Sequence, residues 1–250
     1  MQIQGKRALV TGGTKGIGAA VARDLAARGA RVAVAARQDD RAVRDLVDSA
    51  SDLEGEIRFF QADVGDPAAA TALVERVAGE FGGLDILVHS AGGPAGGTTE
   101  GVSPEAWHAA FDVHVHAAFH LVRAAAPRLR EPGEAAVVLV SSVAGIRGVP
   151  GILAYGTVKG AVAQMTRNMA LDLADDNVRV NCVAPGIIRT RFHDAMSEEQ
   201  KKHNLAVRIP LHREGTPDDV AEVVRLLVTN DFMTGEMVVV DGGMTMQISR

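Results

Sequence analysis

Several features common in other classes of protein are scarce in this 250-residue chain. It has a single cysteine, Cys182, which excludes an internal disulfide and suits a reducing compartment. The net charge of −5 lacks the basic excess of proteins whose main partner is nucleic acid. No apolar run reaches the length of a membrane span, and the first residues, MQIQGKRALV, lack the charged leader and apolar core of a secretory signal. We therefore expect a cytosolic protein with neither nucleic acid nor a membrane as its partner.

Short runs rich in Val, Ile and Leu alternate with longer segments of helical period. Most of these runs are apolar on both faces, which is typical of parallel strands covered on both sides. The runs span residues 7–12, 31–36, 56–61, 84–90, 135–142, 178–186 and 236–243. Between two of them, residues 66–83 open with Asp-Pro and close on glycines, which predicts a helix. The repeated order predicts an α/β fold with one doubly wound parallel sheet of about seven strands. No linker divides residues 1–250, so we expect a single domain.

A glycine-rich stretch, TGGTKGIG (11–18), follows the first predicted strand and opens a helix. Glycines let a backbone turn tightly and approach a pyrophosphate, which a helix N-terminus attracts. The spacing Gly-x-x-x-Gly-x-Gly is not the commonest one, and a purely structural turn is the alternative. In this position we interpret it as a dinucleotide site that includes Gly12, Thr14, Lys15, Gly16, Ile17 and Gly18.

The end of the second predicted strand discriminates between the two nicotinamide dinucleotides. A site for NAD usually has an acidic residue about 20 positions after the glycines, to hold the ribose 2′-hydroxyl. Here residues 35–37 read AAR, and acidic residues come only at positions 39 and 40. Arg37 and Lys15 can instead hold a 2′-phosphate. We therefore predict NADP(H); the alternative is NAD(H), with two solvated surface cations.

The only tyrosine of the chain, Tyr155, stands four positions before Lys159 in the stretch AYGTVKGAV (154–162). On a helix these positions share a face, so the phenol and the ammonium would meet. A packed tyrosine beside a solvated lysine is the alternative.

Six motifs follow one another along the chain: TGGTKGIG, LVHSAGG, VLVSSVAG, YGTVK, VNCVAPGIIRT and GEMVVVDGG. Their order resembles that of the short-chain dehydrogenase/reductase family over nearly the whole chain. Residues 209–227 are similar to the corresponding region of 3-oxoacyl-carrier-protein reductases and of sugar or polyol dehydrogenases in that family. The resemblance implies a dinucleotide-binding Rossmann domain and a homotetramer or homodimer. It also implies an oxidoreductase that interconverts a carbonyl and a secondary alcohol by hydride transfer.

The resemblance also implies individual roles. Ser142, 13 residues before Tyr155, would donate a hydrogen bond to the substrate oxygen, and Tyr155 would exchange a proton with that oxygen. Lys159 would hold the nicotinamide ribose, and its charge would lower the phenol pKa from about 10 toward neutrality. Further cofactor contacts, for which plain loop residues are the alternative, would be Asp63, Val64, Ser90, Ala91, Gly92, Pro185, Gly186, Ile188 and Thr190.

Two histidines mark departures from the family pattern. Residues 89–92 read His-Ser-Ala-Gly, where the family commonly has Asn-Asn-Ala-Gly or similar. His114 stands where the family usually has the asparagine of its catalytic tetrad, which is thought to hold a water between the lysine and solvent. Imidazole can preserve this relay and make it sensitive to pH, or His114 simply fills the space. His116 and His120 have a spacing found in zinc sites, but no third ligand is near in sequence. For these two, and for His108, we predict a subunit interface and no metal.

The substrate pocket is expected beside Tyr155, under a polar lid around residues 189–214. Its other walls would be residues 93–97 and 147–152. Aromatic residues are only 4% of the chain, so no large stacking platform for a steroid or flavonoid is evident. Three side chains either recognise an anionic or hydroxyl-rich small molecule or are surface charges: Arg147, Arg191 and His193. An NAD-dependent sugar or polyol dehydrogenase is one alternative function; a dinucleotide-binding regulatory protein with little turnover is another.

Overall fold

Seven parallel strands form one sheet in the computed structural model, which describes residues 1–190 and 196–247. The strand order is β3-β2-β1-β4-β5-β6-β7, so the chain winds outward in both directions from the neighbours β1 and β4. The strands are β1 Arg7–Thr11, β2 Arg31–Ala36, β3 Glu56–Gln61, β4 Ile86–His89, β5 Ala135–Val140, β6 Val178–Pro185 and β7 Met237–Val240. Each lies within a run predicted from the sequence, and the doubly wound α/β fold is confirmed.

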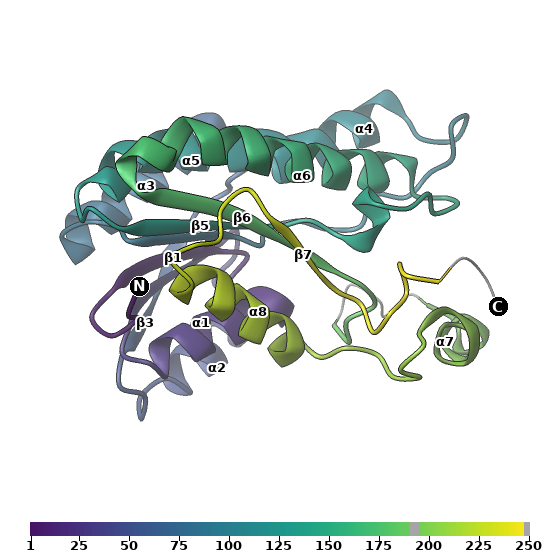
Figure 1. Ribbon diagram of the computed structural model, residues 1–250, viewed down its shortest axis with the longest axis horizontal. Coiled ribbons are helices and arrows are strands. Elements are labelled where there is room, and N and C mark those ends of the chain that lie inside the picture. Colours follow the sequence, from purple (N-terminus) through teal and green to yellow (C-terminus); the bar gives the residue numbers. More distant parts are fainter. Residues whose placement is uncertain (191–195, 248–250) are drawn as a thin grey trace.

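Helices cover both faces of this sheet (Figure 1). One face carries α1 (Gly16–Ala26), α2 (Arg41–Asp48) and α8 (Pro217–Thr229). The other carries α3 (Pro67–Phe81), α4 (Pro104–Phe111), α5 (Ala117–Arg130) and α6 (Leu153–Leu173). The short α7 (Glu198–His203) lies apart from both layers, between β6 and α8 in the chain. None of the helices in the described part of the chain is long and apolar enough to cross a membrane.

The predicted helix at 66–83 shows how local chemistry sets the element bounds. Asp66 caps α3: its carboxylate accepts hydrogen bonds from the backbone amides of Ala68 (2.7 Å) and Ala69 (3.0 Å). Pro67 occupies the first turn, where its missing N–H costs nothing. Gly82 ends the helix in the left-handed conformation, with φ of 77°, which only glycine adopts freely.

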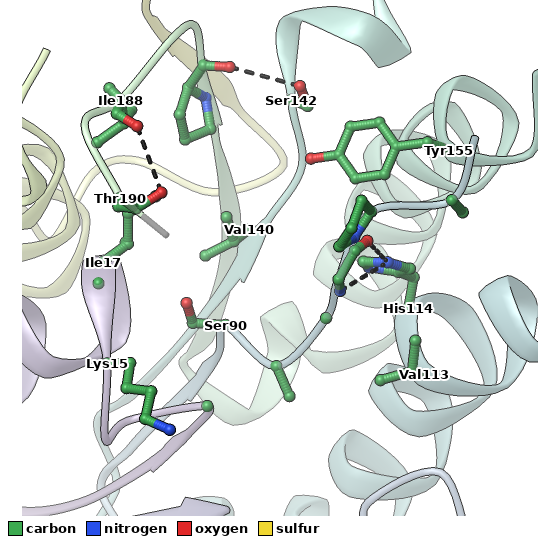
Figure 2. Close-up of a pocket in the computed structure, with 18 of the residues that line it drawn as sticks. Lys15, Ile17, Ser90, Val113, His114, Val140, Ser142, Tyr155, Ile188 and Thr190 are labelled. Carbon is green, nitrogen blue, oxygen red and sulfur yellow. Dashed lines mark hydrogen bonds between the residues drawn. The ribbon is translucent and has the colours of Figure 1, made fainter. Parts of the chain in front are cut away.

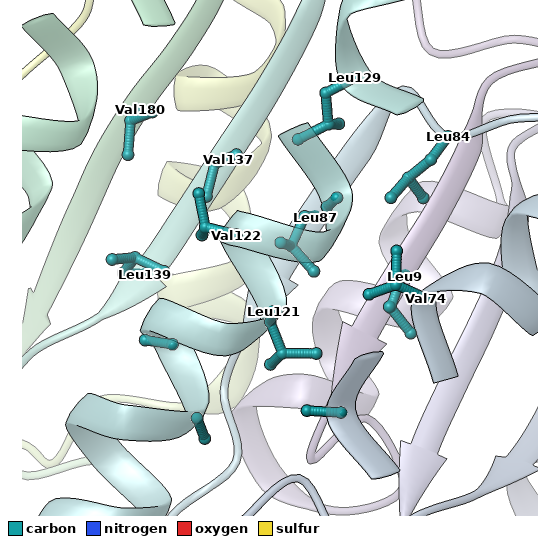
Figure 3. Packing of buried hydrophobic residues seen from close by; sticks show 14 of the residues in the cluster. Leu9, Val74, Leu84, Leu87, Leu121, Val122, Leu129, Val137, Leu139 and Val180 are labelled. Carbon is teal, nitrogen blue, oxygen red and sulfur yellow. The ribbon is translucent and has the colours of Figure 1, made fainter. Parts of the chain in front are cut away.

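The core lies in two layers, one on each face of the sheet. Figure 3 shows Leu121, Val122 and Leu129 of α5 packed over strand residues such as Leu87 and Val137. All five are at most 3% exposed, and each buried side chain of this kind stabilises the fold by about 1.5–3 kcal/mol. Both faces of the strands are covered, so only the loops at the carboxyl ends of the strands remain to bind a ligand.

Candidate active site

A cleft of about 1390 Å³ runs along the carboxyl ends of the strands. It spans β1 and β4, the pair at which the winding reverses and where ligands of such sheets bind. Every predicted catalytic or cofactor-binding residue lines the cleft except Gly18, which is buried. Figure 2 shows Lys15 and Ile17 on one side of the cleft, and Tyr155 and His114 on the other.

The glycine loop between β1 and α1 leaves no room for a side chain at Gly12 or Gly18. A Cβ on Gly12 would lie 2.7 Å from the backbone nitrogen of Ala91, and one on Gly18 would lie 2.3 Å from the carbonyl oxygen of Gly12. Helix α1 begins at Gly16 without a capping side chain and without an acidic residue in its first turn. Its first amides are therefore left for an anion, which the helix dipole also attracts. This arrangement fits the pyrophosphate of a dinucleotide.

The end of the cleft next to β2 carries the two predicted cations. Arg37 is exposed there, and Lys15 forms a 2.5 Å ion pair with Asp40. The hydrogen bond from Lys15 lowers the pKa of Asp40, whose other oxygen caps α2 by accepting from Ala42 (2.9 Å). The sequence did not predict this ion pair, which fixes one of the two cations at the mouth of the cleft.

Ser142, Tyr155 and Lys159 come together from two elements. Ser142 follows β5; its hydroxyl accepts from the amide of Ala144 (3.2 Å) and donates to the carbonyl of Pro185 (3.5 Å). Tyr155 and Lys159 lie one turn apart on α6, and the Lys159 nitrogen is 5.5 Å from the centre of the Tyr155 ring. The phenol oxygen points toward Ser142 in Figure 2. The sequence prediction that the phenol and the amine share a face is therefore confirmed.

The protonation of Tyr155 and Lys159 differs from what the sequence predicts. Burial lowers the pKa of Lys159 to about 7, and its amine donates to the carbonyl of Val140 (2.8 Å). The pKa of Tyr155 is raised, because burial outweighs the hydrogen bond with Ser142. The expected lowering of the phenol pKa by Lys159 is thus not found in the protein alone. The physical reason is that the amine is itself desolvated and partly neutral near pH 7.

His114 lies behind Tyr155, in a π-helical turn (Asp112–His116) between α4 and α5. It is 2% exposed, its Nε2 lies 3.0 Å from the carbonyl of Gly93, and its ring meets the Tyr155 ring edge-on at 5.7 Å. Burial, and next the charge of Lys159, lower the His114 pKa to about 3. The imidazole is therefore neutral near pH 7, which speaks against the pH-sensitive relay, one of the two alternatives that the sequence left open. Among the described residues, the buried Nδ1 has no hydrogen-bond partner. Gly92 makes room for the ring, since a Cβ there would lie 2.2 Å from its Cε1.

A second buried histidine, His89 at the end of β4, had no predicted role. Its Nδ1 lies 2.8 Å from the Thr11 hydroxyl of β1, and its Nε2 lies 3.2 Å from the Val113 carbonyl. Burial lowers its pKa to about 4. His89 therefore ties the centre of the sheet to the π-helical turn that carries His114. The sequence signal was a polar side chain that closes an otherwise apolar strand and departs from the asparagine common in the family.

The other histidines of the continuous segment from α4 to α5 do not line the cleft. His108 is exposed, and His116 forms a 2.9 Å contact with Asp112 of its own helix. In residues 1–190 and 196–247, no group of three or more His, Cys, Asp or Glu side chains is placed to hold a metal ion.

The cations expected in the substrate pocket are placed differently. Arg147 is exposed outside the cleft and donates to the carbonyl of Thr245 (2.8 Å). Arg191 and His193 lie outside the described residues. Arg208, which the sequence did not single out, lines the cleft instead.

Comparisons with known proteins agree with this geometry. The family model described as enoyl-(acyl carrier protein) reductase matches residues 12–245. Versicolorin reductase of Emericella nidulans is 36% identical over 97% of this chain and 96% of its own length. The 3-oxoacyl-[acyl-carrier-protein] reductase of Thermotoga maritima is 34% identical, over 98% of this chain and 99% of its own. Among solved structures, a short chain dehydrogenase from Burkholderia cenocepacia in complex with NADP superposes with a TM-score of 0.89. It is 34% identical, and the match covers 97% of this chain and 98% of that one.

Proposed function

The chain belongs to the short-chain dehydrogenase/reductase family of oxidoreductases, and from this we propose that it interconverts a carbonyl and a secondary alcohol with NADP(H) as its cofactor. The observation that carries the proposal is the convergence of Ser142, Tyr155 and Lys159 in the cleft that also contains the glycine loop. The similarity to a 3-oxoacyl thioester reductase places thioesters among the substrates to test, beside simple ketones and keto sugars.

Three observations support NADP(H) over NAD(H). Arg37 occupies the place where an acidic residue would select NAD, and Lys15 faces the same end of the cleft. The related structure from Burkholderia cenocepacia holds NADP. The residues that would hold the dinucleotide are the predicted ones: the glycine loop for the pyrophosphate, Asp63 and Val64 for the adenine, and the loops after β4 and β6 for the nicotinamide end.

The side chains divide the remaining chemistry among them. When bound, the nicotinamide supplies or accepts a hydride. The Ser142 hydroxyl donates a hydrogen bond to the substrate oxygen, and Tyr155 gives that oxygen a proton during reduction. The raised pKa of Tyr155 keeps the phenol protonated and ready for this step. Lys159, with a pKa of about 7, is the group nearest to the phenol that can resupply the proton at neutral pH.

His114 has a positioning role in this proposal. Its Nε2 lies 3.0 Å from the carbonyl of Gly93 and 3.4 Å from the amide of the same residue. In the tautomer in which Nε2–H donates to the nearer carbonyl, Nδ1 is an acceptor beside the charge of Lys159. This acceptor can take the place of the asparagine of the family in linking Lys159 to solvent. We expect His114→Asn to retain the rate and its pH profile, and His114→Ala to lower kcat and to shift the profile. An unchanged rate and profile in His114→Ala would show that the imidazole only fills space.

A homotetramer is part of the proposal, and the lid around residues 189–214 and the cytosolic location remain predictions. Large apolar side chains are exposed on the helices that pair subunits in the family: Phe119 on α5 is 44% exposed and Leu171 on α6 is 80% exposed. Light scattering coupled to size-exclusion chromatography gives the mass directly; a monomer would contradict the assembly.

The function is tested by initial rates with NADPH and NADH against ketones, 3-oxoacyl thioesters and keto sugars. Tyr155→Phe should lose at least about 100-fold in kcat, since it removes the proton donor. Lys15→Ala and Arg37→Ala should each lower the preference for NADPH by about tenfold. Equal loss with both cofactors, or better rates with NADH, would favour an NAD-dependent sugar or polyol dehydrogenase. Tight NADPH binding without turnover on any substrate would favour a regulatory protein.

A further inference from the structure

The far end of the cleft carries a cation that the proposed chemistry does not use. Arg208 ends a π-helical turn (Asn204–Arg208) that follows α7, in the connection from β6 to α8. Arg37, at the dinucleotide end, follows β2. Since β2 and β6 lie on opposite sides of the β1–β4 pair, the two guanidinium groups belong to opposite ends of the cleft.

Arg208 is held in place by a neutral partner. Its Nη1 donates to the side-chain oxygen of Asn204 (3.0 Å), and the Asn204 amide nitrogen donates to the sulfur of Met196 (3.4 Å). Asn204 is only 3% exposed, so this amide is a fixed anchor inside the protein. A guanidinium has five N–H donors, and one of them is used here. Within the described part of the chain, no carboxylate forms an ion pair with Arg208.

The other cations around the cleft are mostly engaged. Lys15 pairs with Asp40, Arg189 pairs with Glu214 (3.4 Å), and Lys159 donates to a backbone carbonyl. Unlike Lys15 and Arg189, Arg208 is therefore oriented by a neutral side chain and not by a carboxylate; unlike Lys159, it has no role in the proposed proton transfer.

The surroundings of Arg208 indicate what it would bind. Ala95, Val149 and Ile152, from the loops after β4 and β5, give the substrate end of the cleft an apolar wall. Arg208 and Met196 line both the cleft and an adjoining hollow of about 320 Å³, so the guanidinium lies where the two meet. This combination suits a molecule with a short apolar body and an oxyanion at one end.

We propose that Arg208 is the specificity-determining residue of the substrate pocket and that the substrate is a carbonyl compound, or the matching alcohol, with an anionic group. Arg208 binds this group through charge-assisted hydrogen bonds, and Asn204 holds the guanidinium in position. The substrate class rests on the proposed function, but the anion subsite is measured by binding and needs no turnover.

The test is calorimetric titration of the protein saturated with NADP⁺, which keeps the probes away from the glycine loop. The probes are butanoate, hexanoate and octanoate, each compared with its amide. At least one acid should bind about tenfold or more tightly than its amide, and this preference should disappear in Arg208→Met. Arg208→Lys should keep part of the preference. The matched control, Arg147→Met, removes an arginine outside the cleft and should keep it fully.

Two results would overturn the subsite: an acid preference that survives Arg208→Met, or no acid preference at any chain length in the unaltered protein. Circular dichroism of each variant confirms that the fold is intact. A larger Arg208-dependent preference for hexyl phosphate than for hexanoate would support the subsite and assign it to a phosphate. Failure of the proposed function would be seen separately, either as no binding of NADP⁺ or as turnover that Tyr155→Phe does not change. If NADP⁺ does not bind, the probes are titrated into the protein without it.

Discussion

The two buried histidines should make the folded protein sensitive to mild acid. His89 and His114 are 3% and 2% exposed, and burial lowers their pKa values to about 4 and about 3. A histidine in the unfolded chain titrates at about 6.5. Below this pH the unfolded chain binds protons that the folded protein does not bind. The free energy of unfolding therefore falls as the pH falls from about 6.5 toward about 4.

The size of the effect follows from the separation of these pKa values. Each pH unit below the unfolded pKa lowers the free energy of unfolding by about 1.4 kcal/mol per histidine. Between pH 7 and pH 5 this amounts to about 2 kcal/mol for each imidazole and about 4 kcal/mol for both. Folded proteins are stable by only about 5–15 kcal/mol, so the loss is a large fraction of the total. It corresponds to a fall of about 8–16 °C in melting temperature for a chain of this size.

The control for this prediction is the double variant His89→Asn/His114→Asn. It removes both titrating groups and introduces the residue that the family resemblance places at these positions. Denaturant unfolding at pH 7 and pH 5, followed by circular dichroism at constant ionic strength, gives the loss for each protein. The unaltered protein should lose about 4 kcal/mol more than the double variant, and each single variant should remove about half of that excess. Equal losses in the unaltered protein and the double variant would refute the reasoning.

Two further predictions concern the cleft. The first uses ¹³C NMR of the five lysines, in which the Cε resonance of Lys159 should titrate near pH 7. The resonance is assigned by its absence in Lys159→Met. Titration of all five lysines near their usual pKa of about 10.4 would contradict the burial of the amine. Gly18→Ala should weaken NADP⁺ binding at least about tenfold and destabilise the fold by about 1–3 kcal/mol, because its Cβ would meet the Gly12 carbonyl at 2.3 Å. The control is Gly79→Ala, on the exposed face of α3, where no atom lies within 4 Å of the new Cβ. It should bind NADP⁺ normally and raise the free energy of unfolding by up to about 1 kcal/mol. Normal binding by both variants would show that NADP⁺ binding does not require close packing of the glycine loop.

Local features of the sequence determined the fold and most of the candidate site. Apolar runs with β-branched residues became the seven strands, because period and burial are written into neighbouring residues. Asp66 and Gly82 set the two ends of α3 through contacts with residues a few positions away. Tyr155 and Lys159 share a face of α6 because helical geometry alone places them there. Parallel topology then brings the loop ends to one edge, which is why the predicted residues line one cleft.

The tertiary structure alone decided how these groups are charged and paired. The pKa values of Lys159 and His114 depend on desolvation by elements far away in the chain, so their protonation could not be predicted from the residues alone. Thr11 and His89 are 78 positions apart, and Arg147 reaches a carbonyl 98 positions away. Arg208 lines the cleft although it lies in the connection between β6 and α8, far in the chain from the glycine loop and from Tyr155. Contacts between distant segments leave no local period or spacing in the sequence, and these contacts set the protonation and the pairing of the side chains in the cleft.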